Sequence, residues 1–151
     1  MTTFHAHTLG LPDPDLDAQF YQNVPSRRLA AWVIDGIITF AMTVIASVFT
    51  FGLGFFIFPI VWLIIGLIYR TVTIGADSAT WGMSMMGIEF RDKAGRRFTS
   101  GLALIHTALF TIASGTFIVQ AISVGLILTT RYQQSLPDMI LGTTAINRPF
   151  D

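Results

Sequence analysis

Asp35 is the strongest candidate for a functional residue, because it is a carboxylate inside a strongly apolar stretch. From Gly36 to Tyr69 the chain contains no Asp, Glu, Lys or Arg. An Asp at the centre of a membrane-spanning helix costs about 2.5–3.5 kcal/mol, so such a residue should face other helices and find a partner there. Arg70 ends the uncharged stretch and would lie at a similar depth on an antiparallel second helix. We therefore predict an ion pair between Asp35 and Arg70.

A histidine stands alone in a second uncharged stretch. Between Phe98 and Thr130 the only ionisable side chain is His106. An ion or proton could cross the membrane along Asp35, Arg70 and His106 if these groups line one path. The competing explanation is packing, since small and hydroxylated residues at steps of three and four are typical of helix contacts in membranes. We favour packing and keep the path as the alternative.

Other catalytic and metal-binding patterns are missing from the sequence. There is no Cys, and no HExxH, GxSxG or phosphate-loop pattern. Two of the three histidines, His5 and His7, belong to the N-terminal segment. Residues 13–17 look like the start of a calcium-binding loop, but Ala18 and Val24 stand where that loop needs Gly and Glu. We therefore expect no enzymatic activity, no metal and no cofactor.

The composition indicates which kind of element must position these side chains. Of the 151 residues, 52% are hydrophobic and 12% are charged, nine basic residues balance nine acidic ones, and the mean hydropathy is +0.63. A soluble domain needs a larger charged surface, and a nucleic-acid-binding protein needs a basic one. The composition therefore favours an integral membrane protein over a soluble enzyme, a disordered chain or a nucleic-acid-binding protein.

The uncharged stretches predict an all-α membrane fold built on a helical hairpin. Helices over about 28–50 and 55–74 are each long enough to cross a bilayer. The turn at 51–54 contains two glycines, which suit a tight connection. The third apolar segment, about 100–130, is either one long tilted helix or two short helices folded back at 114–115. Hydropathy alone leaves both alternatives open.

Short strands are predicted beside the membrane. Alternating residues in 88–91 and 97–99 around a turn at 93–96 predict a small β-hairpin. Residues 142–147 also have strand character, and their pairing with 88–91 would favour the folded-back alternative for the third segment. Residues 1–25 contain three Asp and no Lys or Arg, which predicts a flexible acidic tail ahead of the transmembrane domain rather than a signal peptide.

The basic residues predict the orientation. Arg27 and Arg28 precede the first helix, and four basic residues lie within 91–97, whereas the turn at 51–54 has none. Loops rich in Lys and Arg face the cytoplasm. We therefore expect a multi-pass protein of the inner (cytoplasmic) membrane with a cytoplasmic N-terminus and a small cytoplasmic β-hairpin.

Three separated motifs resemble the RDD family of small membrane proteins. The first is RRLAAWVID at 27–35, the middle one consists of SATWGM at 78–83 and GIEFRD at 87–92, and the last is PDMILGT at 137–143. The resemblance covers about residues 25–148. It implies that the Arg and the two Asp that name the family are Arg28, Asp35 and Asp138, with Arg27 as a possible substitute for Arg28.

The chain departs from the family pattern at three positions. Met83 stands where the middle motif usually has Lys, Pro137 stands where a polar residue often precedes the late Asp, and His106 stands where an Arg is common. If those cations bind or relay something, this chain lacks that ability. We also predict a contact between Arg28 and Asp138 at the cytoplasmic interface.

The resemblance implies a membrane protein for which transport, including cation/proton exchange, has been proposed. Transport would use Asp35, and one copy has too few helices to enclose a pathway, so we expect a homo-oligomer or a larger membrane complex. The alternative is a non-catalytic scaffold or assembly partner of such a complex. Beyond the lipid bilayer, the sequence does not name a partner or a substrate.

Overall fold

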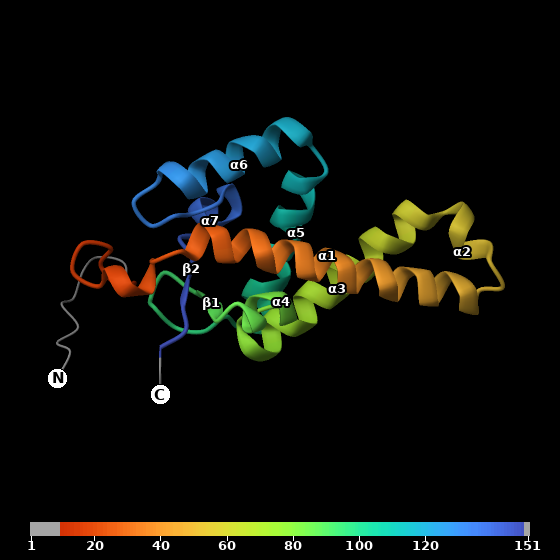
Figure 1. Cartoon of the computed structure of the whole chain (residues 1–151), viewed down its shortest axis with the longest axis horizontal. Helices are drawn as coiled ribbons and strands as arrows, with labels where there is room; N and C mark the ends of the chain where they lie inside the picture. The colour runs from red at the N-terminus through yellow and green to blue at the C-terminus, as the bar shows by residue number, and fades with distance from the viewer. Residues whose placement is uncertain (1–9, 150–151) are drawn as a thin grey trace.

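The computed structural model describes residues 10–149 (Figure 1), so His5 and His7 lie outside the described residues. Its elements follow one another along the chain as a 3-10 helix η1 (Ala18–Phe20), α1 (Val24–Phe49), α2 (Leu53–Phe56), α3 (Phe58–Asp77), α4 (Trp81–Met85), β1 (Ile88–Arg91), α5 (Ser100–Ser114), α6 (Phe117–Thr129), α7 (Leu136–Leu141) and β2 (Thr144–Asn147).

The long helices α1 and α3 form the predicted antiparallel hairpin. Each begins with a proline in its first turn, where the missing amide hydrogen would have no partner within the helix. Both are long and apolar enough to cross a membrane, and only 22% and 17% of their apolar windows are buried within the protein. The predicted turn contains the short helix α2. Most of the hairpin surface is therefore free to face lipid.

The third apolar segment is bent and is not one straight helix. Helices α5 and α6 meet at an angle of 118° at the break that follows Ser114. With 15 and 13 residues, each is about 20 Å long, which is short of a 30 Å hydrocarbon core. The alternative of a single long tilted helix is therefore wrong, and the break lies where Ser114–Gly115 predicted it.

The small sheet joins distant parts of the chain. Strand β1 pairs antiparallel with β2, with Ile88 opposite Asn147 and Arg91 opposite Thr144. The predicted hairpin between 88–91 and 97–99 is wrong, because Ser78 takes that edge of β1. Phe90 donates its backbone N–H to the Ser78 carbonyl (2.7 Å), and Phe98 donates its N–H to the Ser78 hydroxyl (3.0 Å).

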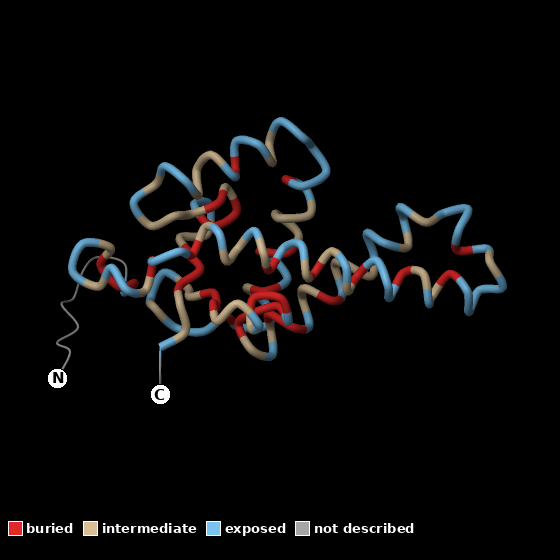
Figure 2. The backbone as a smooth tube through the Cα atoms, in the orientation of Figure 1, coloured by how far each residue is buried: buried red, intermediate tan, exposed pale blue. Residues whose placement is uncertain are grey.

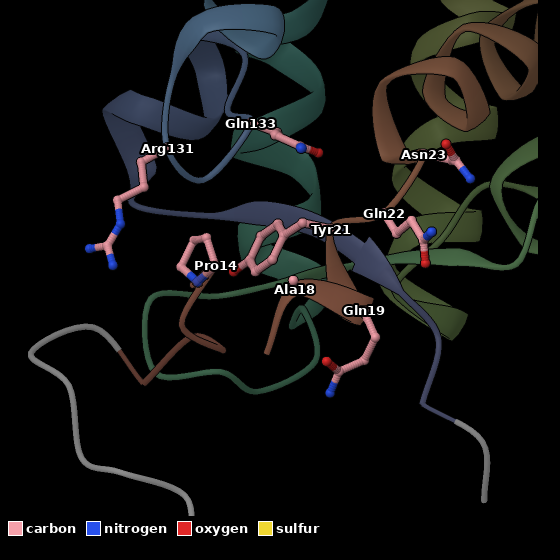
Figure 3. Close-up of a pocket in the computed structure, with 8 residues that line it drawn as sticks. All are labelled: Pro14, Ala18, Gln19, Tyr21, Gln22, Asn23, Arg131 and Gln133. Carbon is pink, nitrogen blue, oxygen red and sulfur yellow. The ribbon is translucent and has the colours of Figure 1, made fainter. Parts of the chain in front are cut away.

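The segment before α1 is held against the domain. Leu11 and Tyr21 are each only 4% exposed, and the Tyr21 hydroxyl donates to the Pro12 carbonyl at 2.8 Å. Figure 3 shows the ring of Tyr21 next to Pro14, with Arg131 above Pro14. The prediction of a flexible tail is therefore wrong from residue 11 onward, because apolar side chains of the acidic segment are buried against the rest of the protein.

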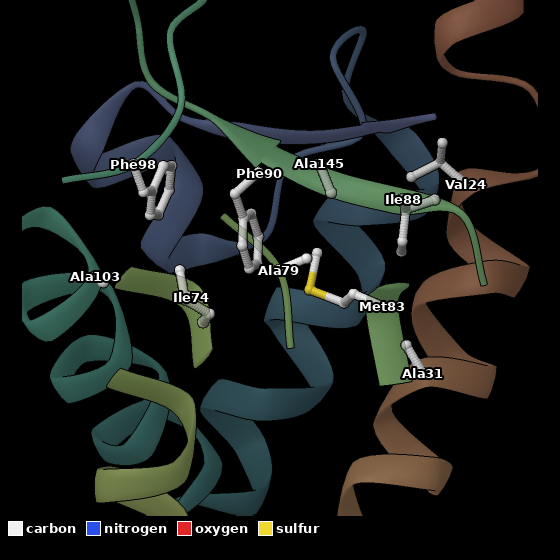
Figure 4. Packing of buried hydrophobic residues seen from close by; sticks show 10 residues of the cluster. All are labelled: Val24, Ala31, Ile74, Ala79, Met83, Ile88, Phe90, Phe98, Ala103 and Ala145. Atoms are coloured by element: carbon white, nitrogen blue, oxygen red, sulfur yellow. The ribbon is translucent and has the colours of Figure 1, made fainter. Parts of the chain in front are cut away.

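The apolar core is small and lies at one end of the hairpin. Figure 2 shows the buried residues gathered around the first half of α1, the end of α3 and the sheet, whereas most of the far end of the hairpin is exposed. Figure 4 shows the cluster that joins these elements. It consists of Val24, Ala31, Ile74, Ala79, Met83, Ile88, Phe90, Phe98, Ala103 and Ala145. This core fixes α1, α3 and α5 relative to one another beside the two signature carboxylates.

Candidate functional site

The carboxylate of Asp35 lies where α1, α3 and α4 meet. The side chain is 6% exposed. Its Oδ1 accepts hydrogen bonds from the Tyr69 hydroxyl (2.6 Å) and the Gly82 backbone N–H (2.9 Å). Its Oδ2 accepts from the Thr80 hydroxyl at 2.6 Å. Three hydrogen-bond donors therefore replace the water that solvates an exposed carboxylate. The same hydrogen bonds connect α1 to α3 and α4.

The predicted ion pair between Asp35 and Arg70 is wrong. Successive residues of a helix point about 100° apart, and in α3 it is Tyr69 that faces α1. The guanidinium of Arg70 turns towards α5, where its central carbon lies 3.9 Å from the centre of the Phe110 ring. Arg70 donates no hydrogen bond to any described residue, and its Nε is buried.

The second carboxylate, Asp138, is completely buried. Arg28 donates to its Oδ2 from Nη1 at 2.8 Å, which confirms the predicted Arg28–Asp138 contact. Ser135 donates to the same oxygen through its backbone N–H and hydroxyl (3.1 and 2.8 Å), so Asp138 also closes the first turn of α7 as a capping box. Thr143 donates to Oδ1 at 2.9 Å.

The charge state of Asp138 follows from this surrounding. Burial alone would raise the pKa of the carboxyl, but the Arg28 guanidinium and the hydrogen bond with His106 outweigh burial and hold that pKa well below its usual value. Asp138 is therefore an anion that binds α1 and α5 to α7.

His106 is the link from Asp138 to α5. Its Nε2 lies 2.7 Å from Asp138 Oδ1, and the imidazole is 1% exposed. The ring packs against Phe90 and Phe98, with centroids 4.5 and 5.5 Å away. Where the family resemblance implies an Arg, this chain therefore has a smaller group that still reaches the late aspartate.

The structure brings four of the predicted residues to one cavity. Arg28, Asp35, Arg70 and His106 all line a cavity of about 730 Å³ between α1, α5 and α6. No direct hydrogen bond joins Asp35, Arg70 and His106 to one another among the described residues. They therefore share a space and do not form a hydrogen-bonded chain.

A second cavity, of about 510 Å³, lies beside the segment before α1 (Figure 3). Its charged residue, Arg131, donates to Asp13 at 3.1 Å and to Asp15 at 2.5 Å. Burial raises the pKa of Tyr21, helped by the nearby Tyr132 and Asp13, so its hydroxyl remains a neutral donor. These contacts hold the segment in place, and we assign this cavity a structural role.

Sequence reasoning missed every donor to Asp35 and, apart from Arg28, the donors to Asp138. Thr80 begins α4, where its hydroxyl accepts the Met83 N–H while donating to Asp35. Gly82 must be small, because a Cβ there would lie 2.4 Å from the Ala31 carbonyl oxygen. Both belong to the SATWGM motif, which was a usable signal. Thr143 likewise belongs to the PDMILGT motif. Tyr69 lies in none of the motifs and becomes a neighbour of Asp35 only in the folded chain.

Two of the three comparisons with known proteins gave no match. Neither the curated proteins nor the solved structures that were compared with the chain matched it. The model of the RDD family matches residues 24–142, which is most of the chain and includes Arg28, Asp35 and Asp138. Together with the two helices able to cross a bilayer, this match makes the protein a membrane protein. The chain therefore belongs to the RDD family.

Proposed function

We propose that this protein transports a small ion or solute across the inner (cytoplasmic) membrane, with cation/proton exchange through Asp35 as its form. The observation that carries the proposal is the position of Asp35. It lies in a helix able to cross a bilayer, and it also lines the 730 Å³ cavity with Arg70 and His106. Ionisable groups at membrane depth are costly and commonly mark the route of an ion or proton.

The pathway would need more than one copy. Two crossing helices cannot surround a route through a bilayer, and among the described elements only the short turn helix α2 packs against the far half of the hairpin formed by α1 and α3 (Figure 1). We therefore propose a homo-oligomer, or a complex with another membrane protein, in which the neighbour completes the route. We further propose that the protein has no enzymatic activity and uses neither a cofactor nor a nucleic-acid partner.

The proposed orientation follows from the charges and the contacts between the chain ends. Asn147 donates from Nδ2 to the carbonyls of Gln19 and Gln22 (2.8 and 2.9 Å), so β2 and the segment before α1 lie together. The basic residues of 91–97 lie near this end, and the turn at 51–54 lies at the other (Figure 1). By the positive-inside rule we place the end with η1 and β2 in the cytoplasm.

Flux measurements test the proposal. Purified protein is reconstituted in liposomes that contain a pH-sensitive dye, and Na⁺, K⁺ and proton gradients are applied in turn. We expect the wild type to exchange a cation for protons and folded Asp35→Asn to lose that flux. Asp15→Asn, which removes a largely exposed carboxylate outside the helices, is the matched control and should keep it. Correctly inserted wild type without flux would contradict the transport proposal.

One observation favours a second function. Three donors bind Asp35, and four residues bind Asp138. These contacts are sufficient to give both carboxylates a purely structural role, in which they hold the helices together. The protein would then be a scaffold or assembly partner, with the exposed sides of α1 and α3 as its contact surface. This function predicts co-purification with one larger membrane protein at a fixed ratio, and no flux from the isolated chain.

A further inference from the structure

The Arg70 guanidinium has no hydrogen-bond acceptor among the described residues. It rests on the Phe110 ring, its Nε is buried, and it donates no hydrogen bond to a described residue. Arg70 is partly buried, and a cation at membrane depth without hydrogen-bond acceptors is costly. The nearby acids do not supply one, because Asp35 is held by three other donors and Asp138 by Arg28 and its own helix cap. The N–H groups of Arg70 therefore find no acceptor among the described residues, and the side chain lines the open cavity.

The cavity around Arg70 has the shape and chemistry of a lipid site. It follows α1 from Asn23 to Asp35, which is about 18 Å of helix. Its walls are apolar side chains that α1 and α6 also expose on the outer surface, namely Leu29, Trp32, Val124 and Leu128. A hydrocarbon chain that lies between these walls remains in apolar surroundings, as it does in the bilayer.

The chemistry of the guanidinium selects the headgroup. Its planar fork of N–H donors matches two oxygens of one phosphate group and binds them more strongly than neutral acceptors. Arg28 also lines the cavity, but its charge is paired with Asp138, so Arg70 is the cation that the headgroup meets. A zwitterionic headgroup would bring its own cation next to the Arg70 guanidinium, so an anionic headgroup fits better.

We propose that the cavity between α1 and α6 binds one anionic phospholipid, with its phosphate on Arg70 and an acyl chain between the two helices. The lipid closes the open side of the cavity and gives Arg70 its acceptor. This inference goes beyond the transport proposal, since lipid binding is measured without any flux and could fail or succeed independently of it.

Native mass spectrometry of the full chain tests the inference. The protein is released from micelles after titration with phosphatidylglycerol or with phosphatidylcholine of the same acyl chains. We expect one tightly retained phosphatidylglycerol per chain, and at least about tenfold weaker retention in Arg70→Gln. Arg96→Gln removes an equal charge from a side chain that is 79% exposed and outside the cavity, so it should bind like the wild type.

A second variant guards against loss of fold in Arg70→Gln. Val124→Trp keeps Arg70 and places a bulky indole in the cavity, in the space that the acyl chain would occupy. Because Val124 is 46% exposed, the variant should fold and should not bind the lipid. Equal retention of the two lipids, or full retention by both variants, would overturn the proposal. So would a dimer without bound lipid, which would identify a second copy as the occupant. Displacement of the lipid by millimolar inorganic phosphate would overturn it in favour of a free anion.

Discussion

At the scale of single residues, the two family aspartates hold the fold through different partners. Asp35 is bound by neutral donors, a phenol, a hydroxyl and a backbone N–H. Asp138 is bound by a cation, Arg28, and also contacts His106. A neutral set of donors leaves the negative charge of Asp35 uncompensated by any direct ion pair. Asp35 lines the cavity and Asp138 does not, so under the transport proposal the uncancelled charge of Asp35 is the one that an ion in the cavity would meet.

The two adjacent arginines should differ sharply in their effect on stability. Arg28→Ala leaves the buried Asp138 without its cation, and we expect a loss of about 3 kcal/mol in the free energy of unfolding. Arg27 donates only to neutral acceptors, the Met86 carbonyl (3.3 Å) and Asn147 Oδ1 (3.1 Å), so Arg27→Ala should cost about 1 kcal/mol. Thermal unfolding in one detergent compares them, and equal losses would mean that Arg27 can replace Arg28.

The stability supplied by Asp138 should depend on pH in one direction. Because its pKa is lowered in the folded protein, its contribution is complete above the unfolded value of about 3.9 and is lost as pH falls below that value. Asp138→Asn should therefore be destabilised by about 3 kcal/mol at neutral pH, and its difference from the wild type should shrink below about pH 4. Unfolding scans between pH 3 and pH 7 measure this, and a difference independent of pH would contradict it.

At the scale of elements, short segments outside the long helices fix how those helices meet. Helix α4 has only five residues, yet together with its N-cap residue Thr80 it supplies two of the three donors to Asp35. Helix α7 has six residues and carries Asp138 to both α1 and α5. Such short helices have little stability of their own. Their positions therefore depend on the carboxylates as much as the carboxylates depend on them.

The close approach of α4 to α1 makes Gly82 a sensitive position. A Cβ at Gly82 would lie 2.4 Å from the Ala31 carbonyl oxygen and 2.7 Å from Asp35 Oδ1. We expect Gly82→Ala to push α4 away and to cost about 3 kcal/mol. Gly66→Ala in α3 is the matched control, because nothing lies within 4 Å of a Cβ there, and it should be neutral or slightly stabilising. Comparable unfolding temperatures for the two variants would show that α4 does not pack as described.

At the scale of the whole molecule, the protein is divided along its length. One end holds the apolar core, the sheet, both carboxylates and the ordered segment before α1, and the other consists of α1 and α3 joined through the short helix α2 and is mostly exposed (Figure 2). The bent pair formed by α5 and α6 returns to the packed end, where His106 of α5 and Asp138 of α7 meet. This arrangement favours two full crossings with a re-entrant third segment.

Single cysteines can test that topology directly, since the chain contains no Cys. The sites are Phe51 at the turn, and Arg96 and Arg131, which flank the bent pair and are 79% and 53% exposed. We expect a membrane-impermeant maleimide to label Arg96→Cys and Arg131→Cys from one side of the membrane and Phe51→Cys from the other. Labelling of Arg131→Cys from the side of Phe51 would mean that the bent pair crosses the membrane.

The sequence by itself determined the membrane class, the helical hairpin and the family, and it named 114–115 as the position of a break while leaving a single long helix open. These features depend on local properties: the length of an apolar run, the absence of charge, and the spacing of motifs along the chain. The Arg28–Asp138 contact was also predicted, because both residues belong to motifs that resemble the RDD family. The motifs therefore carried part of the site.

Only the tertiary structure decided which groups surround each carboxylate. Whether Tyr69 or Arg70 faces Asp35 depends on the rotation of α3 about its axis, and neighbouring residues of a helix differ by about 100°. Whether 88–91 pairs with 97–99 or with 144–147 depends on Ser78, which takes one edge of β1. The free guanidinium of Arg70 and the cavity beside it arise from the same long-range contacts, because the packing of three helices fixes which groups are left without a partner.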